Sequence, residues 1–87
     1  MPYIKFSQRD KFNKHIVELV NNLETMGELS YIIYYLILNF MKKHVISYEI
    51  MQNIVGCLEC TKSEFIRRNL VPYENEKKIK NGDIIPH

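Results

Sequence analysis

The sequence contains few residues of the kinds that break helices or cross-link a chain. Its 87 residues include three glycines, three prolines, two cysteines and no tryptophan. So little glycine and proline argues against a β-sandwich or barrel, whose many turns use these residues, and favours helices. Two cysteines are too few for a disulfide framework, which indicates a protein of the reducing cytoplasm.

Strong net charge and long apolar runs are also lacking. The formal net charge is +2, whereas a domain that binds duplex DNA usually has a larger basic excess, so a nucleic-acid partner is not favoured. The longest apolar stretch, residues 29–41, is too short to span a bilayer. No apolar run follows the first charged residue as it does in a signal peptide. We therefore expect a soluble protein with no membrane partner.

Start and stop signals predict three helices. Ser7, Thr25 and Ser47 each fit an N-cap position, and Ser7 is followed by Asp10 in an imperfect capping box. The third helix should end near residue 70, because Pro72 disfavours helical backbone at the residue before it. The short connections predict antiparallel neighbours in a compact three-helix bundle. The predicted segments are an extended N-terminal arm (1–7), helices at about 8–24, 26–44 and 47–70, and a C-terminal extension (71–87).

The second predicted helix is apolar around almost its whole circumference. Two neighbouring helices of so small a chain cannot cover such a helix on all sides. We therefore expect a homo-oligomer in which the tyrosine side of this helix faces another subunit or a bound ligand. The alternative is that the arm and the tail fold back and cover it within one chain. The side expected at the interface consists of Tyr31, Tyr34, Tyr35 and Leu38.

Residues that commonly build metal or catalytic sites are present but scattered. Cys57 and Cys60 form a CxxC motif, but there is no second cysteine pair for zinc. The motif also lies in the middle of a predicted helix, whereas a redox motif usually begins one. No Ser/His/Asp or Cys/His set has a spacing that brings its members together, and there is no glycine-rich phosphate loop. We expect no metal, no cofactor and no enzymatic activity.

Positive charge concentrates around the end of the third predicted helix. Residues 62–80 contain six Lys or Arg and three Glu, a local charge of +3. Two arginines at a helix end can hold a phosphate through paired hydrogen bonds, and a nearby tyrosine ring can stack on a base. Lysines beyond them would attract the anion. The predicted ligand-binding residues are Arg67, Arg68, Tyr73, Lys77, Lys78 and, from the arm of a neighbouring chain, Tyr3.

The same segment has a second interpretation. Glu64, Glu74 and Glu76 carry the negative charges that could neutralise the arginines within the protein. The segment would then be a set of ion pairs that holds subunits together and would bind no ligand. Sequence alone does not separate the two interpretations.

Short motifs are spread along nearly the whole chain. They are MPYI at the start, GELSY at residues 27–31, and a C-terminal block with LEC, EF, two arginines, PYE and NGD. In these motifs the sequence resembles a family of short uncharacterised proteins of phages, bacteria and archaea. It departs from the family pattern at Ser30, where Asn is expected, and at Ile66, where Tyr is expected. The resemblance implies no established activity, but it suggests that the protein belongs to a phage. We then expect it in the cytoplasm of the host cell.

Three functions follow as expectations. The first is a non-enzymatic helical oligomer that binds and sequesters a small anionic ligand of the nucleotide type, as phage counter-defence proteins of similar size and architecture do. The alternative is a protein-interaction module that inhibits or scaffolds a partner, such as a host protein. The third is a weak nucleic-acid binder, whose affinity would fall steeply with salt.

Overall fold

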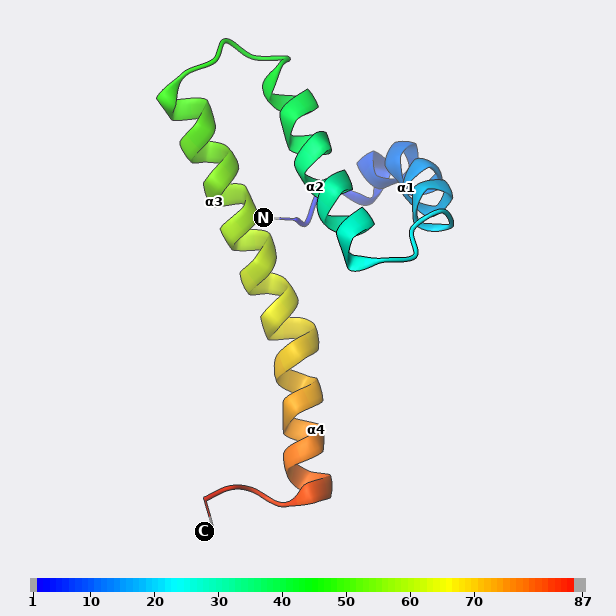
Figure 1. The fold of residues 1–87 in the computed structure, drawn as a ribbon, viewed down its shortest axis with the longest axis vertical. Helices are drawn as coiled ribbons and strands as arrows, with labels where there is room; N and C mark the ends of the chain where they lie inside the picture. Colours follow the sequence, from blue (N-terminus) through cyan, green and yellow to red (C-terminus); the bar gives the residue numbers. More distant parts are fainter. Residues whose placement is uncertain (1, 86–87) are drawn as a thin grey trace.

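The computed structural model of the protein describes residues 2–85 and consists of helices joined by short connections (Figure 1). No strand occurs in this part of the chain. The prediction of an all-α protein is therefore confirmed. The elements are α1 (Phe6–Val20), α2 (Met26–Met41), α3 (Tyr48–Phe65), a π-helical turn η1 (Ile66–Leu70) and α4 (Val71–Asn81).

Two of the three predicted helix starts are confirmed by their capping hydrogen bonds. The backbone N–H of Glu28 donates to Thr25 Oγ1 at 3.1 Å, and the N–H of Thr25 donates to Glu28 Oε1 at 2.9 Å, which completes a capping box. The N–H of Ile50 donates to Ser47 Oγ at 3.2 Å. These bonds satisfy backbone donors that the first turn of a helix leaves without partners.

The start of α1 differs from the expectation. The helix begins at Phe6, two residues earlier than the Ser7 and Asp10 signal places it. The side chain of Gln8 accepts a hydrogen bond from the N–H of Lys5 at 3.2 Å, so glutamine supplies the contact expected from aspartate. The longer glutamine side chain spans the three residues back to the N-cap, as Glu or Gln does in a capping box.

The predicted helix end at Leu70 is wrong, because the chain passes Pro72 without leaving helical geometry. Through the turn η1 the N–H of Val71 donates to the carbonyl of Ile66, five residues back. Proline has no N–H, and its ring clashes with the carbonyl four residues earlier, so an ordinary α-turn is costly there. The wider π turn removes the close approach to that carbonyl. Helix α4 then continues to Asn81, where Gly82 ends it with a positive φ of 89°.

The helices do not enclose a common core. Helices α2 and α3 run in opposite directions and approach each other (Figure 1). Helix α3 continues through η1 into α4, and the resulting long rod extends well beyond α2. None of residues 2–85 is buried. The radius of gyration is 17.4 Å, whereas a compact chain of this length would have about 12 Å. The single chain therefore does not show the compact antiparallel bundle that the sequence predicts.

Helix α2 keeps its apolar surface open to solvent. On the tyrosine side, the exposed fractions are 60% for Tyr31, 65% for Tyr34 and 50% for Tyr35. The rings of Tyr31 and Tyr35 stack on each other with centroids 5.7 Å apart. The arm and the C-terminal segment thus leave these rings uncovered. No helix within residues 2–85 has the length and apolar character needed to cross a membrane.

Replacing Pro72 with alanine should stabilise the rod. The substitution P72A restores a backbone donor and removes the ring clash, so we expect the π turn to become an α-turn and the free energy of unfolding to rise by about 1–3 kcal/mol. Chemical denaturation at a fixed protein concentration measures this change. P2A in the extended arm is the matched control and should change little. A clear loss of stability in P72A would mean that the π turn is held by contacts other than the proline.

Candidate functional site

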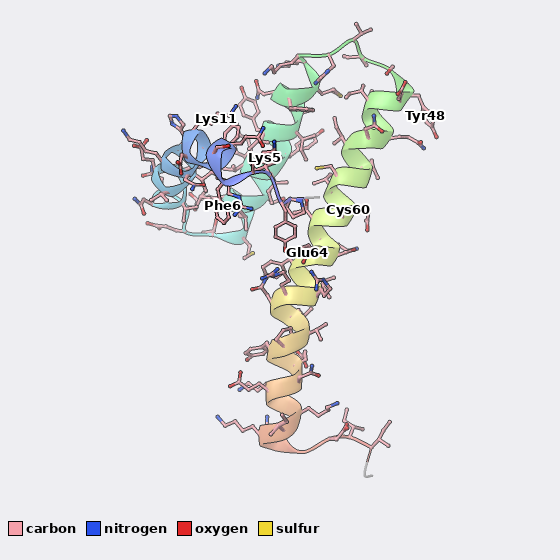
Figure 2. All side chains as sticks on the ribbon, turned by 180° about the vertical axis from the view of Figure 1, so that it is seen from behind. Lys5, Phe6, Lys11, Tyr48, Cys60 and Glu64 are labelled. Carbon is pink, nitrogen blue, oxygen red and sulfur yellow. The ribbon has the colours of Figure 1, made fainter. Side chains whose placement is uncertain are left out.

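The N-terminal arm folds back on the long rod at Glu64. The hydroxyl of Tyr3 donates a hydrogen bond to Glu64 Oε1 at 3.0 Å and accepts one from Arg68 Nη1 at 2.9 Å. Arg67 pairs with the same Glu64 oxygen. Figure 2 shows Glu64 on the rod where the arm passes it. We call these four residues, Tyr3, Glu64, Arg67 and Arg68, the Tyr3 cluster.

Local structure on both sides explains how the cluster forms. In the arm, Arg9 reaches back from α1, and its Nε donates to the carbonyl of Ile4 at 2.8 Å, which fixes the path of the chain next to Tyr3. On the rod, Glu64 and Arg67 are three residues apart and therefore lie on neighbouring turns of one helix. Both arginines lie in the π turn, a type of helical irregularity that is frequent at functional sites.

Glu64 is ionised at the centre of the cluster. Its side chain is 17% exposed, against 68% for Arg67. Loss of solvent raises the pKa of Glu64, but hydrogen bonds from Tyr3 and Arg67 and the positive charges of Arg67 and Arg68 outweigh this, so the pKa lies below its usual range. One carboxylate between two guanidinium groups leaves the cluster with a net charge of +1.

A solvent-open hollow lies beside the cluster. Its volume is about 400 Å³, at the lower end of the range for small-molecule sites, about 300–1,000 Å³. The hollow combines the ring of Phe65, a guanidinium, a carboxylate, a hydroxyl and an amide. Its lining residues include Tyr3, Thr61, Glu64, Phe65, Arg68 and Asn69. Arg67 faces a separate shallow hollow beside Cys60 and Ser63.

The remaining predicted ligand residues lie further along the rod, on α4. The ammonium of Lys77 is 5.6 Å from the centre of the Tyr73 ring, within range of a cation–π contact. Lys78 lies 3.8 Å from Asp83, so its charge is partly compensated within the C-terminal segment. In the part of the chain that the structure describes, these residues make no hydrogen bond or ion pair with the Tyr3 cluster. The six predicted residues therefore fall into two groups.

Two features of the cluster differ from the sequence-based interpretation. Tyr3 contacts Arg68 from its own chain, whereas we had expected it from a neighbouring chain. Glu64 is the centre of the cluster, although the sequence suggested it only as a competing internal partner. The spacing of Glu64 and Arg67 was a visible signal for their pair, but nothing local in the sequence connects either residue to Tyr3, which lies about sixty positions earlier.

The cysteines and acidic residues form no candidate metal site among residues 2–85: no group of three or more His, Cys, Asp or Glu side chains lies close enough together to hold an ion. Cys57 and Cys60 are both free thiols on the exposed surface of α3.

The arm should detach from the rod in acid. The folded-state pKa of Glu64 is lowered, so the ionised carboxylate stabilises the docked arm. This stabilisation is fully present above the unfolded-state pKa of Glu64 and is lost as the pH falls through the folded-state pKa. A carboxyl titration followed by NMR should place the midpoint of Glu64 below the usual range for glutamate. The amides of residues 3–5 should lose protection from hydrogen exchange over the same pH interval. In E64Q the arm amides should already exchange quickly at neutral pH, whereas E76Q on α4 should leave them unchanged.

Comparison with known proteins gives a family and no functional relative. No curated protein and no solved structure matches the chain. One family model matches residues 1–84, almost the whole sequence, and its description is a domain of unknown function, DUF6899. The chain therefore belongs to the DUF6899 family.

Proposed function

We propose that this protein is a non-enzymatic helical oligomer that binds a small phosphorylated ligand of the nucleotide type at the Tyr3 cluster. The observation that carries this proposal is the gathering of Tyr3, Arg67 and Arg68 around one carboxylate, beside a hollow that also contains the ring of Phe65. Guanidinium groups and aromatic rings are the side chains that bind phosphates and bases.

The arginines keep hydrogen-bonding capacity for an anion. A guanidinium has five N–H donors in a planar fork. The contacts within residues 2–85 use Nη2 of Arg67 and Nη1 of Arg68. Since the ion pair with Glu64 compensates only one of the two positive charges, a phosphate meets a net positive cluster whose side chains are already held in place. This arrangement lowers the ordering cost of binding.

Two aromatic rings line the hollow and are suited to a base. Phe65 is 64% exposed and Tyr3 is 48% exposed, so both present ring surface to solvent. Stacking on an aromatic side chain contributes about 1–3 kcal/mol per base in nucleic-acid complexes. Lys77 and Tyr73 on α4 form a cation–π contact further along the same rod. In our proposal they bind the outer part of the ligand or attract it by charge.

Self-association is supported by the amount of exposed surface. The chain has an accessible surface of 8235 Å², whereas a folded monomer of its mass, 10.4 kDa, would have about 5,400 Å². The excess of about 2,800 Å² is somewhat larger than the area that one partner contributes to big obligate interfaces, about 1,000–2,500 Å². In this proposal, the subunits cover the apolar surface that a single chain leaves open.

Binding without chemical conversion gives the protein a biological role as a sequestering agent. A stable oligomer with several copies of the site withholds its ligand from other receptors by mass action. Within our proposal this role is that of a phage protein acting in the host cytoplasm against nucleotide-based defence.

Substitution of both cluster arginines tests ligand binding. Native mass spectrometry with a panel of nucleoside phosphates and cyclic oligonucleotides should show a bound ligand for the wild type. R67A/R68A should weaken its affinity about 100-fold or more, since hydrogen bonds to charged groups are worth about 1.5–3 kcal/mol each. The control K42A/K43A removes two positive charges after α2 and should bind normally. Unchanged affinity in R67A/R68A with the oligomer intact would remove the ligand proposal.

A protein-interaction module is the second candidate, and the open tyrosine side of α2 favours it. If self-association covers this side, sedimentation of the wild type should give a defined oligomer at micromolar concentration. Y34E would place a charge in the contact at the tyrosine side and should lower the number of subunits in the oligomer. The control Y48E alters a tyrosine at the start of α3 that is 77% exposed, and it should leave the oligomer unchanged. A wild-type monomer with full helical circular dichroism would instead support a different protein as the partner of α2.

A further inference from the structure

A second apolar surface lies between α2 and α3, separate from the Tyr3 cluster. The groove has a volume of about 470 Å³. Leu36, Ile37 and Phe40 line it from α2, and the facing side of α3 adds Ile50, Ile54 and Leu58. No residue of α1 lines the groove. An apolar groove between two helices is the kind of surface on which the apolar face of a third helix can pack.

Helix α1 has an apolar face that is largely open to solvent, although Leu19 at its C-terminal end lines a hollow with Tyr31 and Ile32 of α2. It makes no close backbone approach to any other helix within residues 2–85, and Figure 1 shows it on the side of α2 away from α3. Phe12 is 46% exposed, Ile16 54% and Leu19 37%. These residues recur at steps of three and four, which puts them on one face, while Lys14 and Glu18 lie on the opposite face.

From these two surfaces we infer that α1 of one copy of the chain fills the α2–α3 groove of a second copy, and that the exchange is reciprocal. This inference rests on the self-association in the proposed function and adds the α2–α3 groove as a second contact surface beside the tyrosine side of α2. An α1 of 15 residues is about 22 Å long at 1.5 Å per residue. That is enough to cover the groove, whose α3 side runs only from Ile50 to Leu58.

The amount of surface and the direction of each face agree with this exchange. A reciprocal exchange buries one helix face and one groove of each chain and so covers part of the excess of about 2,800 Å² per chain. The groove residues of α2 and its tyrosine side lie on opposite sides of the helix. One side of α2 is then covered by α1 of the partner, and the other remains for a further contact. The arrangement explains why α2 is apolar all the way round.

Cysteine cross-linking between two different chains tests the exchange. The acceptor chain carries C60S and keeps Cys57, which lines the groove. Donor chains carry C57S/C60S with one new cysteine on the apolar face of α1: F12C, I16C or L19C. The control donor carries K14C on the polar face. Donor and acceptor are unfolded together, refolded and oxidised with diamide, and the products are identified by mass.

At least one apolar-face donor should give a donor–acceptor disulfide, in about tenfold excess over the K14C control, since the bond requires Cα atoms within about 7 Å. An intrachain disulfide in the single chain I16C/C60S at high dilution would overturn the exchange, because α1 would then fill its own groove. Oligomers without any donor–acceptor product would also overturn it while leaving self-association intact. A monomeric wild type would overturn both the exchange and the self-association.

Discussion

The helices of this chain carry more apolar surface than they can cover among themselves, and the rest of the structure depends on this constraint. Backbone hydrogen bonds within a helix do not stabilise a helix of 15 or 16 residues in water, so most of its stability comes from packing of an apolar face. Because none of residues 2–85 is buried, the single chain does not provide this packing. In our proposals a second copy supplies it, and folding and assembly then become one concentration-dependent equilibrium.

The Tyr3 cluster connects the two ends of the sequence independently of the apolar surfaces. Glu64 holds the arm through Tyr3 and one arginine through an ion pair, so a single carboxylate sets both the position of the arm and the residual positive charge. Surface ion pairs of this kind contribute little to stability. Their value here is geometric, because they hold the Tyr3 ring and the Arg68 guanidinium at the hollow, with Arg67 beside it, before any ligand arrives.

Local signals in the sequence predicted the local structure well. The hydroxyls of Thr25 and Ser47 mark helix starts because each can bond only to backbone donors a few residues away. The same reasoning failed at Pro72, because the rule that ends a helix before proline applies to α-turns and a π turn avoids the clash. The contact of Tyr3 with Glu64 could not be predicted, since it joins distant parts of the chain. The position of α1 away from α3 could not be predicted from the sequence either. An amphipathic pattern shows that a helix has an apolar face, but it does not show whether that face packs within its own chain or on another chain.

The π turn also contains one residue more than an α-turn, because its hydrogen bond spans five residues instead of four. Deleting a residue elsewhere in α3 or α4 turns everything beyond it by about 100° around the helix axis, because an α-helix has 3.6 residues per turn. A deletion within residues 66–70 would narrow the wide turn to an ordinary one and bring back the clash of the Pro72 ring, but Tyr73 and Lys77 would keep their direction relative to α3. Combined with P72A, which removes that clash, such a deletion would shorten the rod by one residue without turning α4 relative to α3.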